Sequence, residues 1–221
     1  MAGGGFVYTL MPIICFEGAS AIGKTTTADC FKADSGAFVV PEVNLLFEKP
    51  GNASAEWYFE RQVERWQIAN EQSSFYRLVI LDGDPYQPLW YSWAYNFIGW
   101  QSLDFIEQFY QPKIQDKTLG FPDRYFIFNA TEVELRKRKD ADAARQRRGF
   151  EKHLQMIKPQ RRYFQAMQTF SPHRVCLFEA ESIKTNVKFI QKDIFDSIKF
   201  DEIESEILFN KMVRWLWENN A

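Results

Sequence analysis

The sequence predicts an α/β fold in three layers, with a five-stranded parallel sheet between helices on both of its faces. Five short apolar runs read as strands: "PIICF" at 12, "AFVV" at 37, "RLVIL" at 77, "RYFIF" at 124 and "RVCLF" at 174. The segments between them carry apolar residues every three or four positions, as in "AEWYFERQVERWQIANEQ", which predicts helices. Because parallel strands need crossover connections, this alternation favours a parallel sheet.

Size and composition indicate one globular domain over residues 1–221. The 221 residues are 46% hydrophobic, enough for a continuous core. A formal net charge of −2 argues against binding to a nucleic-acid polymer or a membrane surface. No apolar run reaches 18 residues and the apolar N-terminus has no basic leader, so we expect a cytoplasmic protein. Three widely spaced cysteines indicate small buried residues.

The first strand runs into "FEGASAIGKTTT", residues 16 to 27, which fits the phosphate-binding loop pattern. In this pattern the backbone N–H groups of residues 19 to 25 surround a polyphosphate, while the lysine reaches its outer phosphates. The alternative is a glycine turn with an exposed lysine. The residues expected to bind ATP are Gly18, Ala19, Ser20, Ala21, Ile22, Gly23, Lys24, Thr25 and Thr26.

A second motif, "LVILD" at 78 to 82, is an apolar run that ends in a carboxylate. Many phosphate-binding-loop proteins hold Mg²⁺ with such a carboxylate and the loop hydroxyl. We therefore expect Asp82 and Thr25 to hold Mg²⁺. The alternative is a solvent-exposed aspartate in a turn, because Asp-Gly is a common turn pair.

These residues resemble the P-loop nucleoside and nucleotide kinases, especially the deoxynucleoside kinase and thymidylate kinase branch, over residues 13 to 195. The resemblance implies a phosphotransferase that uses ATP and Mg²⁺. Deoxynucleoside kinases have a glutamate after the second strand that acts as the base on the sugar hydroxyl, and "VVPEVN" offers Glu42 there. The alternative is that Glu42 only caps the following helix.

The sequence departs from these families at two positions. Gly83 stands where the family has an arginine after the third-strand acid, and Asp84 adds a carboxylate that is an alternative base or acceptor ligand. Val43 stands where thymidylate kinases tend to have an arginine for the acceptor phosphate. Because a buried phosphate demands a nearby cation, the sequence favours an acceptor with a free hydroxyl over a nucleotide.

A basic segment follows the fourth strand. From Arg136 to Arg162 there are eleven lysines and arginines against three acids. In the resembling kinases a mobile lid here carries arginines that close over the transferring phosphoryl group. We assign that lid to residues 138 to 150 and that role to Arg145, Arg147 and Arg148, ahead of Gly149. The alternative is a solvated helix face.

Three further segments bear on the acceptor and on assembly. The helix after the second strand faces the acceptor in the resembling kinases, which makes Trp57, Arg61 and Gln62 candidates. The aromatic stretch at 86 to 100 favours core packing or a subunit interface over an acceptor pocket. A helix at about 200 to 218 packs on the sheet or on a second subunit, which leaves a homodimer open.

Three functions therefore remain in competition. The first is a Mg²⁺- and ATP-dependent kinase that transfers the γ-phosphoryl group to a hydroxyl of a nucleoside-like small molecule. The second is a P-loop kinase that acts on a nucleoside monophosphate, or on the hydroxyl of an antibiotic or natural product. The third is a non-catalytic regulatory protein that binds a nucleotide. The identity of the acceptor and the choice between Glu42 and Asp84 as base stay open.

Overall fold

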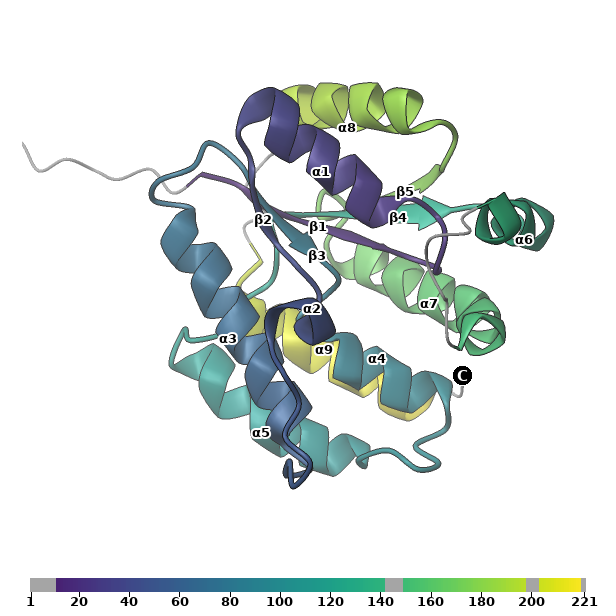
Figure 1. Ribbon diagram of the computed structural model, residues 1–221. Helices are drawn as coiled ribbons and strands as arrows, with labels where there is room; N and C mark the ends of the chain where they lie inside the picture. Colours follow the sequence, from purple (N-terminus) through teal and green to yellow (C-terminus); the bar gives the residue numbers. More distant parts are fainter. Residues whose placement is uncertain (1–10, 142–148, 198–202, 220–221) are drawn as a thin grey trace, which may run out of the picture.

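The computed structural model describes residues 11–141, 149–197 and 203–219. It contains a parallel sheet with the strand order β2-β3-β1-β4-β5 (Figure 1). The five strands are β1 (Ile13–Gly18), β2 (Phe38–Val40), β3 (Val79–Asp82), β4 (Arg124–Asn129) and β5 (Val175–Glu179). Each strand overlaps one of the predicted apolar runs, so the predicted three-layer α/β fold is confirmed.

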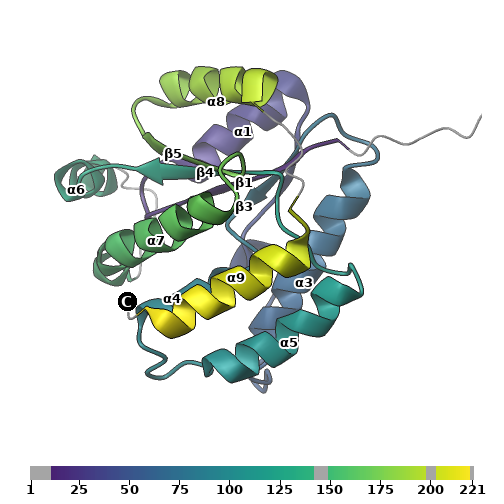
Figure 2. The same ribbon diagram turned by 180° about the vertical axis from the view of Figure 1, so that it is seen from behind.

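Helices cover both faces of the sheet. One face carries α1 (Lys24–Ser35) and α8 (Ile183–Ser197), and Figure 2 shows five other helices on the opposite side. Those on the opposite side are α3 (Trp57–Gln72), α4 (Gln87–Ala94), α5 (Leu103–Gln115), α7 (Phe150–Phe170) and α9 (Ser205–Glu218). The short α2 (Val43–Leu46) follows β2, and α6 (Glu132–Ala141) projects beyond the carboxyl edge of the sheet.

The alternation of side chains along the strands divides the core into two parts. In β1, Cys15 belongs to the larger cluster beneath α3, α4, α5, α7 and α9, whereas Ile14 and Phe16 belong to the cluster under α1 and α8. All three side chains have no exposed surface. This two-sided burial explains why the strands are continuous apolar runs rather than alternating ones.

The aromatic stretch and the C-terminal helix pack together. Trp90 and Trp93 of α4 are each 1% exposed in the larger core, as the core-packing interpretation expects. The tail helix, predicted at about 200 to 218, is observed as α9 and packs against α5 and α7. The Trp93 ring lies 5.2 Å from the Trp215 ring in a tilted arrangement, and its Nε1 donates to the carbonyl oxygen of Asn219 over 2.6 Å.

Two negative findings apply to the described residues. None of the helices in this part of the chain is both long enough and apolar enough to cross a bilayer. The cysteines Cys15, Cys30 and Cys176 are free thiols, and Cys15 is buried while the other two are half-buried.

Candidate active site

The phosphate-binding loop joins the end of β1 to the start of α1. Gly18 has φ +146°, and a Cβ placed on it would lie 2.6 Å from the carbonyl oxygen of Phe128, so a larger residue would displace this neighbouring strand. Gly23, the residue before α1, has no side chain to cap the first turn of the helix, and that turn contains no acidic residue. Because the N–H groups of a first helical turn point toward the N-terminus of the helix, those of α1 point toward the loop, where an anion binds favourably.

Lys24, the first residue of α1, lies across the loop. Its Nζ donates to the carbonyl oxygen of Gly18 over 2.8 Å. Burial by itself lowers the pKa of Lys24, but the nearby carboxylates of Glu17, Glu42 and Asp82 outweigh this effect and raise it. Lys24 is therefore a cation that lies among acidic side chains.

Thr25 and Asp82 meet at the carboxyl ends of β1 and β3. The Thr25 hydroxyl donates to Asp82 Oδ2 over 2.7 Å, and Asp82 is 1% exposed, unlike an aspartate in an open turn. Its other oxygen, Oδ1, has no hydrogen-bond partner among the described residues. A hydroxyl and a carboxylate with a spare buried oxygen fit Mg²⁺, which takes few protein ligands and fills its shell with water and phosphate.

No cluster of three or more metal-binding side chains occurs in the described parts of the chain.

Glu17, the acid directly before the first loop glycine, is a residue that the sequence motifs do not single out. It is 2% exposed and accepts three hydrogen bonds, from the backbone N–H groups of Gly18 and Asp84 and from Gln160 Nε2, at 2.9 to 3.0 Å. Burial raises the pKa of Glu17. This carboxylate connects the loop, the turn after β3 and α7.

Asp84 lies beneath the rim of the site. It is fully buried, and its Oδ1 accepts from the Tyr125 hydroxyl over 2.9 Å and from the Tyr86 N–H over 3.1 Å. Burial, together with the charge of Glu17, raises the pKa of Asp84 to about 7. A carboxylate with no exposed surface contacts an acceptor only after the surrounding side chains move.

Glu42 lies at the open rim. It is exposed and precedes α2, yet its side chain makes no capping hydrogen bond to that helix within the described chain. A Cβ placed on Gly83 would lie 3.8 Å from Glu42 Cγ, so the Glu42 side chain lies beside the turn after β3. Its negative charge acts on Lys24, Tyr58 and His153. Glu42 therefore faces the loop rather than the helix that follows it.

The three candidate acceptor residues of α3 differ in their surroundings. Trp57 is 9% exposed, and Gln62 is buried with its Oε1 accepting from Arg65 Nη1 over 2.6 Å. Arg61 forms an ion pair with Glu64 at 2.8 Å and lies over the Phe47 ring. All three lie on the helix beside β2, but their described partners are other protein groups.

Two polar aromatic pairs lie on the same side of the site and were not anticipated. The Tyr58 hydroxyl donates to Gln87 Oε1 over 2.7 Å, and the Tyr91 hydroxyl lies 3.5 Å from His153 Nδ1. Burial, followed by the charge of Lys24, lowers the pKa of His153. The imidazole is therefore neutral near neutral pH, which leaves little positive charge on this wall.

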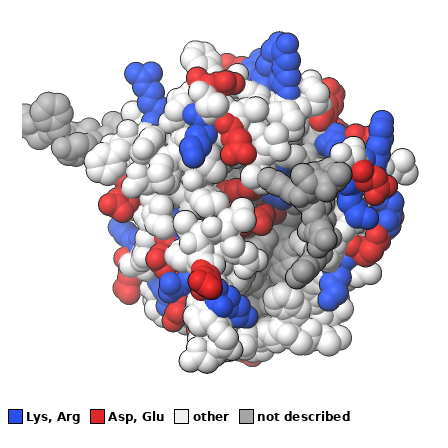
Figure 3. All heavy atoms as spheres, in the orientation of Figure 1, with Lys and Arg blue, Asp and Glu red and all other residues white. Residues whose placement is uncertain are grey.

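The basic segment is described only in part. Arg145, Arg147 and Arg148 lie outside the described residues, as does most of the predicted lid. Arg136 pairs with Glu132 and Glu151. Figure 3 shows basic and acidic side chains mixed at the side of the molecule where α6 lies in Figure 1.

Arg138 instead reaches across the site. Its Nη1 donates to the Ile22 carbonyl over 3.0 Å, and its Nη2 donates to the Ala180 carbonyl over 2.9 Å. The last turn of α6 is thereby fastened to the phosphate-binding loop and to the segment after β5.

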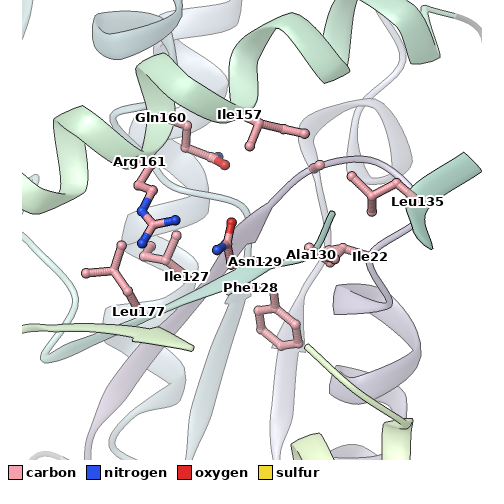
Figure 4. Close-up of a pocket in the computed structure, with 11 residues that line it drawn as sticks. Ile22, Ile127, Phe128, Asn129, Ala130, Leu135, Ile157, Gln160, Arg161 and Leu177 are labelled. Atoms are coloured by element: carbon pink, nitrogen blue, oxygen red, sulfur yellow. The ribbon is translucent and has the colours of Figure 1, made fainter. Parts of the chain in front are cut away.

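A separate hollow opens beside the loop on the α7 side (Figure 4). Ile22, Asn129, Ile157 and Arg161 are among its lining residues, while Glu42 and Asp82 are not. Most of the lining is aliphatic, and Asn129 Nδ2 is already bonded to Glu179. The hollow therefore belongs to the packing of α7 against β4 rather than to the Lys24–Asp82 pair.

Comparison with solved structures identifies the fold. Deoxyadenosine kinase from M. mycoides with bound dATP matches with a TM-score of 0.56 at 15% identity, over 83% of this chain and 100% of that one. Thymidylate kinase from Candida albicans matches with a TM-score of 0.60 at 18% identity, over 86% of this chain and 97% of that one. The chain has the fold of the P-loop nucleoside and nucleotide kinases.

Sequence comparison adds nothing to this likeness, because no protein-family model and no curated protein sequence matches the chain. At 15 to 18% identity the kinase likeness establishes the fold, while the function rests on the residues of the site.

Proposed function

We propose that the protein is an ATP- and Mg²⁺-dependent kinase that transfers the γ-phosphoryl group to a hydroxyl of a nucleoside-like acceptor. The observation that carries this proposal is the position of Glu42, an exposed carboxylate without a capping bond that faces Lys24 across the turn after β3. A general base belongs at that place, next to the phosphate site and open to solvent.

The loop supplies the donor side of the reaction. The first turn of α1, which begins after Gly23, offers N–H groups to the ATP phosphates, and Lys24 exchanges the Gly18 carbonyl for phosphate oxygens. Thr25 and Asp82 would hold Mg²⁺, which supplies charge neutralisation on the phosphates when it is bound. The Arg138 contacts to Ile22 and Ala180 support the loop from the α6 side.

In the transfer step the acceptor hydroxyl oxygen forms a bond to the γ-phosphorus while the bond from that phosphorus to the ADP oxygen breaks. Glu42 takes the hydroxyl proton, and ADP leaves with the electron pair of the broken bond. Asp84 is the less suitable base because it is buried and already accepts from Tyr86 and Tyr125. We further propose that Arg145, Arg147 and Arg148 stabilise the transferring group.

The charges around Glu42 favour a neutral acceptor. In the described part of α3, Arg65 is buried against carbonyl groups and Arg61 is paired with Glu64. The nearby His153 has a lowered pKa. A phosphorylated acceptor would need one of these cations to exchange its present partner, whereas a hydroxyl needs none.

The test is ADP release with a panel of nucleosides, nucleoside monophosphates and antibiotics. We expect a nucleoside to raise ADP release above the acceptor-free rate. Lys24→Ala should reduce turnover about 10²-fold or more, the scale of a lost preorganised charge. The matched control is Lys32→Ala, which removes an exposed lysine from the other end of α1.

The base is tested by Glu42→Gln, which keeps the shape of the side chain and removes its proton-accepting charge. We expect turnover to fall about 10²-fold while ATP still binds. If Asp84→Asn abolishes turnover and Glu42→Gln does not, the base is Asp84. If monophosphates are the better acceptors, the protein is a nucleotide kinase. If no acceptor raises ADP release although ATP binds, the regulatory interpretation replaces the kinase.

A further inference from the structure

Gly83 lies in the turn after β3, close to the side chain of Glu42, and the buried Arg65 of α3 lies beside it. A Cβ placed on Gly83 would lie 3.9 Å from Arg65 Nη2, 3.8 Å from Glu42 Cγ and 4.0 Å from Glu17 Oε2. Arg65 comes from the middle of α3 and is 1% exposed. A guanidinium is thus present at this turn, although the turn's own sequence contains none.

The hydrogen bonds of Arg65 join the ends of two strands. Its Nε donates to the Pro41 carbonyl over 2.7 Å, directly before Glu42. Its Nη2 donates to the carbonyls of Asp82 at 2.7 Å and Gly83 at 3.1 Å. Its Nη1 donates to Gln62 Oε1 of the same helix at 2.6 Å. One side chain therefore binds the backbone next to the base candidate and the backbone of the metal-ligand candidate.

We propose that Arg65 is the positioning residue of the active site, which sets the separation between Glu42, between β2 and α2, and Asp82 at the end of β3. The inference rests on the proposed function, because it concerns the geometry of that same transfer. Arg65 makes no described contact with either carboxylate group, so it acts through the backbone. Strands β2 and β3 pair only as far as Val40 and Leu81. Beyond that point the hydrogen bonds of Arg65 join the two backbones instead.

The planar fork of arginine suits this task better than any other side chain. Arg65 uses Nε and both terminal nitrogens on acceptors from three segments, whereas lysine has a single nitrogen. Burial lowers the pKa of Arg65, and nearby acidic groups including Asp82 and Glu42 oppose that effect. An arginine stays charged under these conditions, so the carbonyls keep charge-assisted hydrogen bonds.

The experiment compares Arg65→Lys and Arg65→Gln with a matched control, Arg174→Lys. Arg174 is also buried, at 6% exposure, and also donates to loop carbonyls, those of Phe121 and Pro122. It directly precedes β5, at the amino edge of the sheet, away from the site. Loss of stability is expected in all of these variants, so stability alone does not distinguish positioning from packing.

We expect turnover at saturating substrates to fall about 10-fold in Arg65→Lys and about 10²-fold in Arg65→Gln, the cost of a misplacement near 1 Å. The KM for ATP should change much less than turnover does, because the loop is untouched. Arg174→Lys should unfold at a lower temperature and keep wild-type turnover. Wild-type turnover in both Arg65 variants, with lowered stability like that of Arg174→Lys, would overturn the proposal.

A second readout does not need phosphoryl transfer. The rise in unfolding temperature that ATP causes is measured once with Mg²⁺ and once with EDTA. The difference between the two rises measures the binding of Mg²⁺ at the Thr25–Asp82 site. We expect Arg65→Gln to reduce this difference and Arg174→Lys to preserve it. If the wild type transfers no phosphoryl group to any acceptor, the proposed function fails, and this readout still decides on Arg65. An unchanged difference in Arg65→Gln would then refute the positioning role.

Discussion

At the scale of single residues, the candidate metal site depends on the contact between Thr25 and Asp82. Asp82→Asn keeps the size of the side chain but removes the charge that attracts a hard cation. We expect the Mg²⁺ concentration for half-maximal turnover to rise about 10-fold or more, while ATP binding in EDTA changes little. Titration of Mg²⁺ against ADP release measures this, with Asp29→Asn on the exposed side of α1 as the control.

An Asp82→Asn enzyme with the wild-type Mg²⁺ requirement would assign the metal to another acid. Glu17 would be the first to consider, since it lies at the end of β1 beside the strand that carries Asp82.

The residues of the site differ in how far the sequence could predict them. Lys24, Thr25 and Asp82 follow from two local motifs, because each motif sits at the carboxyl end of a strand and parallel strands share that edge. Arg65 could not be found this way. Its role depends on which residue of α3 turns toward the β2 and β3 ends, and no residue spacing within that helix records it.

The sequence did contain an indication of the role of Glu17, because an acid at the end of a buried apolar strand is unusual and needs hydrogen-bond partners. The sequence contained no such indication for His153, because its position beside Tyr91 depends on how α7 packs against α4.

At the scale of elements, α9 contributes the apolar side chains of one helix face to the larger core. Leu208, Phe209, Met212, Val213 and Leu216 are each at most 3% exposed. Phe209 packs near the rings of Tyr86 and Tyr110. We expect Phe209→Ala to lower the free energy of unfolding by about 3–5 kcal/mol, the usual cost of a large cavity in a core.

Urea unfolding measures this effect, and Ile207→Ala is the matched control, because Ile207 lies on the same helix with 47% exposure. The control should change the unfolding free energy by less than about 1 kcal/mol. Equal small effects in the two variants would mean that α9 does not stay docked on the core in solution.

The helices also differ in whether the spacing of apolar residues in the sequence could predict them. The periodic segments predicted α1, α3, α5, α6 and α7, and each of these helices buries apolar residues. The pattern for α8 was present, with Val187, Ile190 and Ile194 on one face, but it was not singled out. By contrast, α2 covers only four residues, too few for any period to appear.

At the scale of the whole molecule, two buried acids at the site make folding depend on pH. Burial raises the pKa of Glu17, and burial with the charge of Glu17 raises that of Asp84 to about 7. An unfolded aspartate titrates near about 4. Between about pH 4 and pH 7 the folded protein therefore holds protons that the unfolded chain has released. Stability from this source is complete below about pH 4 and is lost as the pH rises to about 7.

Asp84→Asn isolates this effect, because an amide oxygen still accepts from Tyr86 and Tyr125 but does not titrate. We expect the free energy of unfolding of the wild type to fall more steeply than that of Asp84→Asn from pH 5 to pH 7, and the two curves to run parallel above about pH 8. Glu17 remains in the variant, so a smaller slope of the same sign persists. Urea unfolding across this range measures both curves, with Asp29→Asn expected to follow the wild type. Identical slopes in the wild type and Asp84→Asn would show that Asp84 is already ionised in the folded protein below pH 5, and its negative charge would then have to be balanced by Lys24 or Arg65.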